Sequence, residues 1–169
     1  MNDDNELAIV REGALPVLVA CLEIHAANAT HAETIARAIW NLTAAAPNKA
    51  YAVAAGVVPP LLASLTRHVS VASLCEGTAG ALRNIAGCAE GKSAILSVGG
   101  LPVLQAVVTR HGAASDAGKA AAETIAKVGA PAPAPAPAPP AGCDASCSAR
   151  HSGDGDCLRC GKGWGVHSG

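Results

Sequence analysis

The sequence predicts an all-α protein whose main part is an α-solenoid of three repeats with three helices each. Turns that carry glycine and then proline recur every 43 residues, at 13–16, 56–59 and 99–102. Segments with similar helix-end residues recur at the same spacing, at 39–42 and 82–85. A period of roughly 40 to 47 residues with helical patterning is typical of helical solenoids.

In the first unit, the pattern predicts a short helix over 7–11, a second helix over 15–24 and a longer third helix over 31–45. Pro16 suits the first turn of the second helix, where its missing N–H would lack a partner anyway, and Gly13 ends the helix before it. Residues at helical steps form one apolar stripe on the third helix: Ile35, Ala38, Ile39 and Leu42. One unit cannot bury such a stripe alone, so we expect the units to stack.

Two motifs of the chain closely resemble armadillo repeats. The first motif reads GALPVLVACL, GVVPPLLASL and GGLPVLQAVV, and the second reads IWNLTAAAPNK and LRNIAGCAEGK. The resemblance implies an armadillo domain over residues 1–129, with repeats at 5–47, 48–90 and 91–129. It also implies a right-handed superhelix whose third helices line a concave groove that holds an extended peptide.

If the third helices face the groove, helical spacing from Asn41 and Asn84 selects the exposed side chains. The predicted groove residues are Glu33, Arg37, Trp40, Asn41, Glu76, Arg83, Asn84, Lys119, Glu123 and Lys127. An asparagine amide both donates and accepts, so a column of them can pair with a peptide backbone of any sequence. The alternative is that the asparagines fasten the following inter-repeat loop. Trp40 is either core or an exposed anchor.

The resemblance also bears on the charge of the peptide. In the nuclear-import adaptors of this family, the equivalent asparagines bind the peptide backbone, and a tryptophan four residues earlier builds slots for lysine side chains. Here Arg37 and Gly80 occupy the tryptophan positions, and Lys127 replaces the third asparagine. A mixed or acidic peptide is therefore at least as compatible with these residues as a basic localisation signal.

Composition excludes several classes of partner. The net charge is −1, without the basic footprint of a nucleic-acid-binding protein. No apolar run of 18 residues predicts a membrane-spanning helix, and the acidic start over residues 1–6 does not resemble a secretory signal. We therefore expect an intracellular protein, located in the cytoplasm or, as the alternative, in the nucleus.

The stretch AGCAEGKS, residues 86–93, nearly matches a phosphate-binding loop. Such a loop must follow a strand so that its N–H groups converge on phosphate, whereas here a predicted helix precedes it. We expect no nucleotide binding. No catalytic set of residues is brought together by the predicted fold, so we also expect no enzymatic activity.

Histidines recur at the end of each predicted second helix, at His25, His68 and His111. Stacked repeats lie about 10 Å apart, which is too far for two imidazoles to share one metal ion. We expect each of these residues to stabilise the carboxyl end of its helix as a cation. The cysteines of the helical region are expected to pack as small apolar groups: Cys21, Cys75 and Cys88.

The composition changes after the repeats. Residues 130–142 form a Pro/Ala linker, whose stretch APAPAPAPAPPA over 130–141 extends at about 3.1 Å per residue as a semi-rigid polyproline II spacer of about 37 Å. In the tail over 143–169, Cys157 and Cys160 have the two-residue separation that lets both thiolates reach one zinc ion. The preferred ligands are Cys143, Cys147, Cys157 and Cys160, with His151 and His167 as alternates. A metal-free tail with free thiols is the alternative.

Together these features predict a non-catalytic scaffold that binds an extended peptide or a partner protein in the groove of the third helices. We expect a monomer. The alternative is a piece of a longer armadillo protein with self-associating ends and no independent function, because the first helix lacks the polar cap that the end repeats of a solenoid need.

Overall fold

The structure is a computed structural model that describes residues 3–129. Within this part the chain forms helices and no strand, which confirms the all-helical prediction. The helices are α1 (Asp3–Arg11), α2 (Ala14–Ile24), α3 (Ala29–Leu42), α4 (Ala46–Ala54), α5 (Val58–Arg67), α6 (Ala72–Ile85), α7 (Ala89–Ser97), α8 (Gly100–His111) and α9 (Asp116–Gly129). The predicted linker and zinc-binding tail lie outside the described residues.

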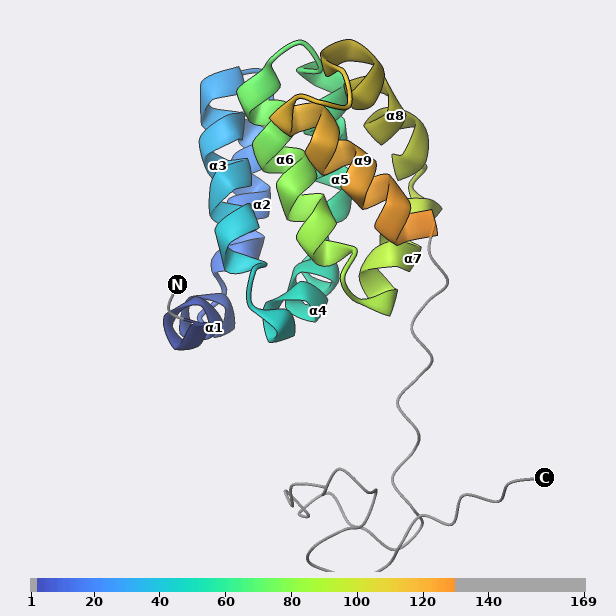
Figure 1. The fold of residues 1–169 in the computed structure, drawn as a ribbon. Coiled ribbons are helices and arrows are strands. Elements are labelled where there is room, and N and C mark those ends of the chain that lie inside the picture. Colours follow the sequence, from blue (N-terminus) through green and yellow to red (C-terminus); the bar gives the residue numbers. More distant parts are fainter. Residues whose placement is uncertain (1–2, 130–169) are drawn as a thin grey trace, which may run out of the picture. The chain divides into compact units, whose positions relative to one another are not determined.

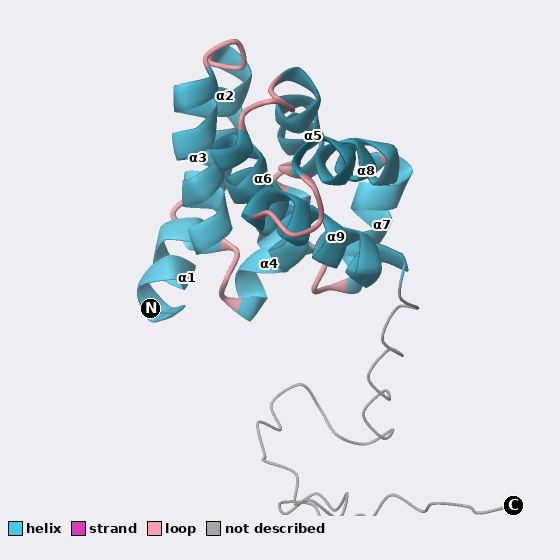
Figure 2. Cartoon of the chain, turned by 45° about the horizontal axis from the view of Figure 1, so that its top comes forward, coloured by secondary structure: helices cyan, strands magenta, loops and turns pink. Residues whose placement is uncertain are grey.

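The helices follow one another in sets of a first, a second and a third helix. The first helices α1, α4 and α7 have 9 residues each, and the third helices α3, α6 and α9 have 14 each. Figure 1 shows the third helices side by side in one layer, and Figure 2 shows the second helices α2, α5 and α8 in another. The most extensive packing joins α3 to α6 and α6 to α9.

Glycine turns separate each first helix from the second helix that follows. Gly13, Gly56 and Gly99 have φ angles of 86°, 71° and 70°, in the left-handed region that side chains disfavour. The proline three residues after each glycine lies in the first turn of the next helix. The turns therefore recur every 43 residues because each needs a glycine at positive φ and a proline in the first turn of the next helix, as the sequence indicates.

The third helix of the first set differs from its prediction at both ends. It begins earlier, at Ala29, because the side chain of Asn28 accepts a hydrogen bond from the backbone N–H of His31 at 3.1 Å. It ends at Leu42 instead of residue 45, since the Asn48 amide donates to the Leu42 carbonyl at 2.8 Å. The Leu42 carbonyl, which would otherwise continue the helix, is thus bonded to a side chain of α4.

Glycines on α6 let α3 approach closely. A Cβ atom at Gly80 would lie 2.6 Å from Cε2 of Trp40, and one at Gly77 would lie 3.1 Å from Cγ of Arg37. The indole and the arginine stem therefore rest on glycine. The missing side chain of Gly80 provides the space for Trp40.

A continuous apolar core lies between the second and third helices. Its largest fully buried side chains include Leu22, Ile39, Leu61, Leu82 and Leu104. No single helix in the described part of the chain is both long and apolar enough to cross a membrane. Only two sharply bent pairs, α4 with α5 and α7 with α8, reach that length and apolarity together.

Gly91, in α7, lies where this first helix packs closely against the end of α6. A Cβ atom there would lie 2.0 Å from the carbonyl oxygen of Ile85, a backbone atom that cannot rotate away. We expect Gly91→Ala to lower the free energy of unfolding by about 1–3 kcal/mol, measured by chemical denaturation followed by circular dichroism. Gly129→Ala is the control, because an added Cβ there meets nothing within 4 Å. Equal stability of the two variants would contradict this packing.

Candidate functional site

The predicted groove residues come together on one face of the third helices, here called the third-helix face. Each of them is half-buried or exposed, so solvent reaches all of them. They are Glu33, Arg37, Trp40 and Asn41 of α3; Glu76, Arg83 and Asn84 of α6; and Lys119, Glu123 and Lys127 of α9. Binding of a peptide to this face stays a prediction.

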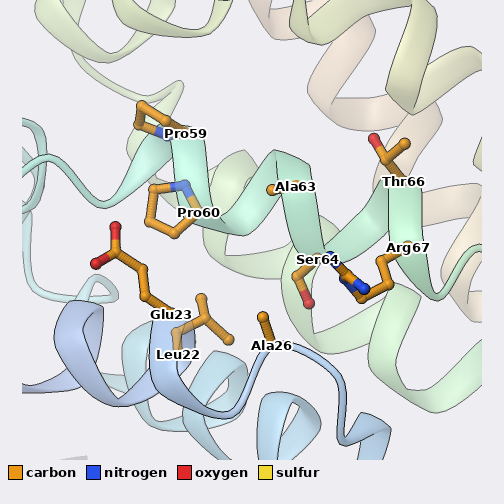
Figure 3. Close-up of a pocket in the computed structure, with 9 residues that line it drawn as sticks. All are labelled: Leu22, Glu23, Ala26, Pro59, Pro60, Ala63, Ser64, Thr66 and Arg67. Carbon is orange, nitrogen blue, oxygen red and sulfur yellow. The ribbon is translucent and has the colours of Figure 1, made fainter.

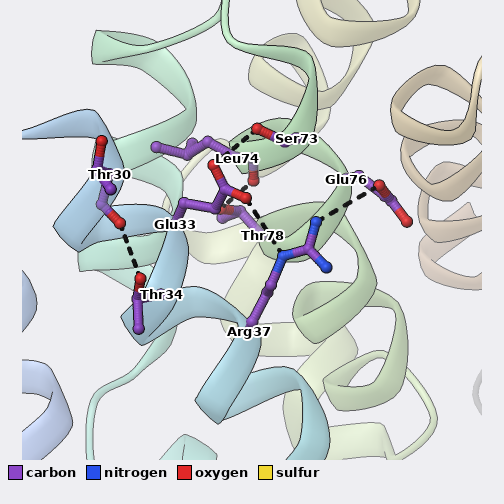
Figure 4. A network of polar contacts seen from close by, with 8 residues as sticks. All are labelled: Thr30, Glu33, Thr34, Arg37, Ser73, Leu74, Glu76 and Thr78. Carbon is purple, nitrogen blue, oxygen red and sulfur yellow. Dashed lines mark hydrogen bonds and ion pairs between the residues drawn. The ribbon is translucent and has the colours of Figure 1, made fainter.

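Charged side chains link α3 to α6 at one end of this face (Figure 4). Arg37 lies between two carboxylates, with Nε 3.4 Å from Oε1 of Glu33 and Nη2 3.9 Å from Oε2 of Glu76. Ser73, which the sequence did not single out, donates to Oε2 of Glu33 at 2.7 Å. Contacts this exposed contribute little stability. They do fix the positions of the charges.

Trp40 combines the two roles that the sequence left open. Its ring is half-buried and packs over Gly80, while the guanidinium carbon of Arg83 lies 5.9 Å from the ring centroid. Nη1 of Arg83 also donates to Oε2 of Glu123 at 2.8 Å. That hydrogen bond holds the pKa of Glu123 below its usual value, and nearby cations act in the same direction. The indole is therefore held between two helices with part of its surface in solvent.

The two asparagines differ in their contacts. The Asn84 amide donates to the carbonyl of Trp40 at 3.1 Å, so it fastens α6 to the preceding third helix and not to the following loop. Asn41 is exposed, and within the described residues its side chain forms no hydrogen bond. Lys127, at the third asparagine position, donates to the carbonyl of Arg83 at 3.3 Å. Trp40 and Arg83 are equivalent positions, so the lysine makes the same link as Asn84.

The recurring histidines have a role that the sequence reasoning missed. Nε2 of His68 lies 2.7 Å from the Ala26 carbonyl, and Nε2 of His111 lies 2.6 Å from the Val69 carbonyl. A carbonyl only accepts, so each ring donates to the turn that follows the preceding second helix. His25 is exposed, and its ring packs edge-on against that of His31 at 5.0 Å. The spacing revealed the recurrence but not the acceptor.

The cysteines of the helical region show two environments. Cys75 is fully buried, and burial raises the pKa of its thiol to about 11. Cys88 is half-buried, and its sulfur accepts the backbone N–H of Gly91 at 3.4 Å at the start of α7. Burial is also the largest cause that raises the pKa of Cys88. Both thiols are therefore poor nucleophiles near neutral pH.

Hollows in the described part of the chain lie mainly outside the third-helix face. One, of about 680 Å³, lies between α2 and α5 and is lined by Leu22, Glu23, Pro60 and Arg67 among others (Figure 3). The equivalent hollow between α5 and α8 is smaller, about 250 Å³. An open hollow of about 740 Å³ adjoins α1 to α3, and of the predicted groove residues it includes only Asn41.

The helices stack in layers, and α3, α6 and α9 each carry a polar face. This arrangement defines a helical repeat protein. The family model of the armadillo/beta-catenin-like repeat matches residues 2–44 and 46–87, about half of the chain. The chain belongs to this armadillo family. No curated protein and no solved structure matches it significantly.

The stability that the His68 hydrogen bond contributes can be measured with the equivalent residue His25 as the control. We expect His68→Ala to lower the free energy of unfolding by about 0.5–1.5 kcal/mol, because it removes one donor and leaves the Ala26 carbonyl without it. His25→Ala removes the equivalent side chain where no such carbonyl is bonded, and should change stability by less than about 0.5 kcal/mol. Equal losses in denaturation experiments would show that the link contributes nothing.

Proposed function

We propose that the chain is a non-catalytic scaffold that binds an extended peptide, or a segment of a partner protein, along the third-helix face. Armadillo repeats generally mediate protein–protein interaction, and this supports the class of function. The observation that carries the proposal is the solvent access of all the predicted groove residues on one face. A peptide there would meet side chains from three parallel helices.

We further propose that α7, α8 and α9 form a third armadillo repeat. The support is that this set repeats the contacts of the set before it. His111 donates to the turn after the preceding second helix as His68 does, and Lys127 donates to the preceding third helix as Asn84 does. Hydrogen bonds at equivalent positions are expected of stacked units with one design.

Two amides would hold the peptide backbone. Asn41 has its full set of donors and acceptors in solvent, and Asn84 keeps its carbonyl oxygen and one N–H after bonding to Trp40. The exposed part of the Trp40 ring lies on the same face and offers apolar surface to a side chain of the peptide. Backbone pairing at the asparagines would set the register, and Trp40 would add affinity.

We expect Asn41→Ala combined with Asn84→Ala to weaken partner binding by about tenfold or more, since each lost hydrogen bond contributes about 1 kcal/mol. The measurement is a quantitative pull-down that compares the partners retained by wild type and variant. Gln105→Ala is the control, because it removes an exposed amide from the second helix α8.

Asn84→Ala also removes a link between helices, so Asn41→Ala alone separates binding from stability. An unchanged partner list for the double variant, with an unchanged melting temperature, would exclude the asparagine clamp.

We also propose that the tail binds one zinc ion through Cys143, Cys147, Cys157 and Cys160, with His151 and His167 as alternates. The support is the ligand spacing in the sequence. Protein purified without chelator should contain about one zinc per chain, and Cys157→Ser with Cys160→Ser should abolish it. Cys21→Ser, in α2, is the control and should retain the metal. Less than about half a zinc per chain in wild type would contradict the site.

A further inference from the structure

The hollow between α2 and α5 carries polar groups that its counterpart one repeat further does not. Its volume is about 680 Å³, which falls in the range of about 300–1,000 Å³ that is typical of small-molecule sites. Most of its lining is apolar, and its charged lining residues are Glu23 and Arg67 (Figure 3). The equivalent hollow between α5 and α8 has about 250 Å³ and no charged residue among the described ones that line it.

Ser64, on the α5 side of this hollow, has a buried hydroxyl without a hydrogen-bond partner among the described residues. The residue is only 4% exposed. By contrast, the buried hydroxyls of Thr43, Thr78 and Thr124 each donate to the carbonyl four residues earlier. A hydroxyl buried without a partner destabilises a fold, and the equivalent residue in α8 is the buried Val107. Core packing therefore does not explain the hydroxyl of Ser64.

Arg67 lies three residues after Ser64, so both side chains are on the same side of α5. Both line the hollow, and Figure 3 shows the hydroxyl of Ser64 turned toward α2. Within the described residues, the guanidinium of Arg67 forms no ion pair and no hydrogen bond. One wall of the hollow thus presents a hydroxyl and a guanidinium, and neither has an acceptor.

Glu23 is the other charged residue of the hollow, and it does not neutralise Arg67 by contact, since the two form no ion pair in the described part of the chain. Figure 3 shows its carboxylate at the end of the hollow where Pro60 lies, away from Arg67. Seven residues of α5 separate Pro60 from Arg67, about 10 Å along the helix. His68, the residue after Arg67, is bonded to the Ala26 carbonyl. The two charges therefore face different parts of a ligand.

We propose that this hollow binds a small apolar molecule that ends in one carboxylate. The carboxylate accepts hydrogen bonds from the Ser64 hydroxyl and the Arg67 guanidinium, and the apolar body lies on Leu22, Pro60 and Ala63. A bond between a guanidinium and a carboxylate is charge-assisted and stronger than one between neutral groups. This site does not rest on the proposed function, because none of its residues belongs to the third-helix face.

The arrangement favours a free monocarboxylic acid over other occupants. A polypeptide that crossed the second helices would next meet the hollow between α5 and α8, which is smaller and offers no charged side chain from the described residues. A molecule with a second carboxylate at its far end would meet Glu23, which repels it. Glu23 thus selects against dicarboxylates, while Ser64 and Arg67 select for one acidic end.

The test uses the full chain labelled with ¹⁵N and NMR titrations with four probes of equal carbon number: octanoate, 1-octanol, octylamine and octanedioate. Octanoate should shift the amide signals of α2 and α5 around the hollow. It should bind about fivefold more tightly than the neutral and cationic probes, since only an anion pairs with the exposed guanidinium, and more tightly than octanedioate.

Two variants test the assigned groups. Arg67→Gln should weaken octanoate binding about fivefold and remove its preference over 1-octanol. The matched control is Arg110→Gln, which removes the equivalent exposed arginine of α8, 43 residues further, and should bind as wild type. Ser64→Ala should weaken octanoate binding without lowering the melting temperature, because the hydroxyl has no partner to lose among the described residues.

Several results would overturn the site. Equal binding of octanoate, 1-octanol and octylamine would show an apolar hollow without selectivity, and a preference for octylamine would show that Glu23 selects a cation instead. Equal weakening by Arg67→Gln and Arg110→Gln would show attraction by overall charge. Signals that shift on the third-helix face in place of α2 and α5 would put the acid elsewhere. An acetylated apolar tetrapeptide that binds more tightly than octanoate would assign the hollow to a polypeptide end.

Discussion

The close approach of α3 to α6 is the constraint on which the arrangement of the third-helix face depends. Gly77 and Gly80 leave room for the side chains of Arg37 and Trp40 directly over the α6 backbone. The ring of Trp40 packs over Gly80 and meets the guanidinium of Arg83, while the backbone carbonyl of the same residue accepts from Asn84. A side chain at Gly80 would push the indole away from α6, and the contact of Arg83 with the ring would be lost.

Polar side chains at equivalent positions join each unit to the one before it. His68 and His111 tie the end of one second helix to the turn after the preceding one, while Asn84 and Lys127 join the third helices. Each donates to a backbone carbonyl near a helix end, where carbonyls lack intrahelical partners. Such links hold the stack at both layers. The third-helix face is therefore a surface whose side chains are positioned before any peptide binds.

The sequence predicts well the features that depend on a single residue, and poorly the contacts between residues that lie far apart in the chain. The turns at Gly13, Gly56 and Gly99 follow from backbone conformation alone, so their spacing is sufficient to place them. The acceptor of His68 lies 42 residues away in the preceding unit, and no local pattern identifies it. In the sequence, Lys127 likewise indicates that the third repeat lacks the asparagine. Its longer side chain nevertheless reaches the equivalent carbonyl.

Charge and amide contacts on this face respond differently to conditions. The ion pairs of Arg37 are exposed and would weaken as salt screens them. Hydrogen bonds from Asn41 and Asn84 to a peptide backbone involve no net charge and are screened far less. Because backbone pairing does not read the peptide's sequence, any selectivity would come from the charged and aromatic side chains around the asparagines. An amide column alone would hold many peptides, and those side chains would choose among them.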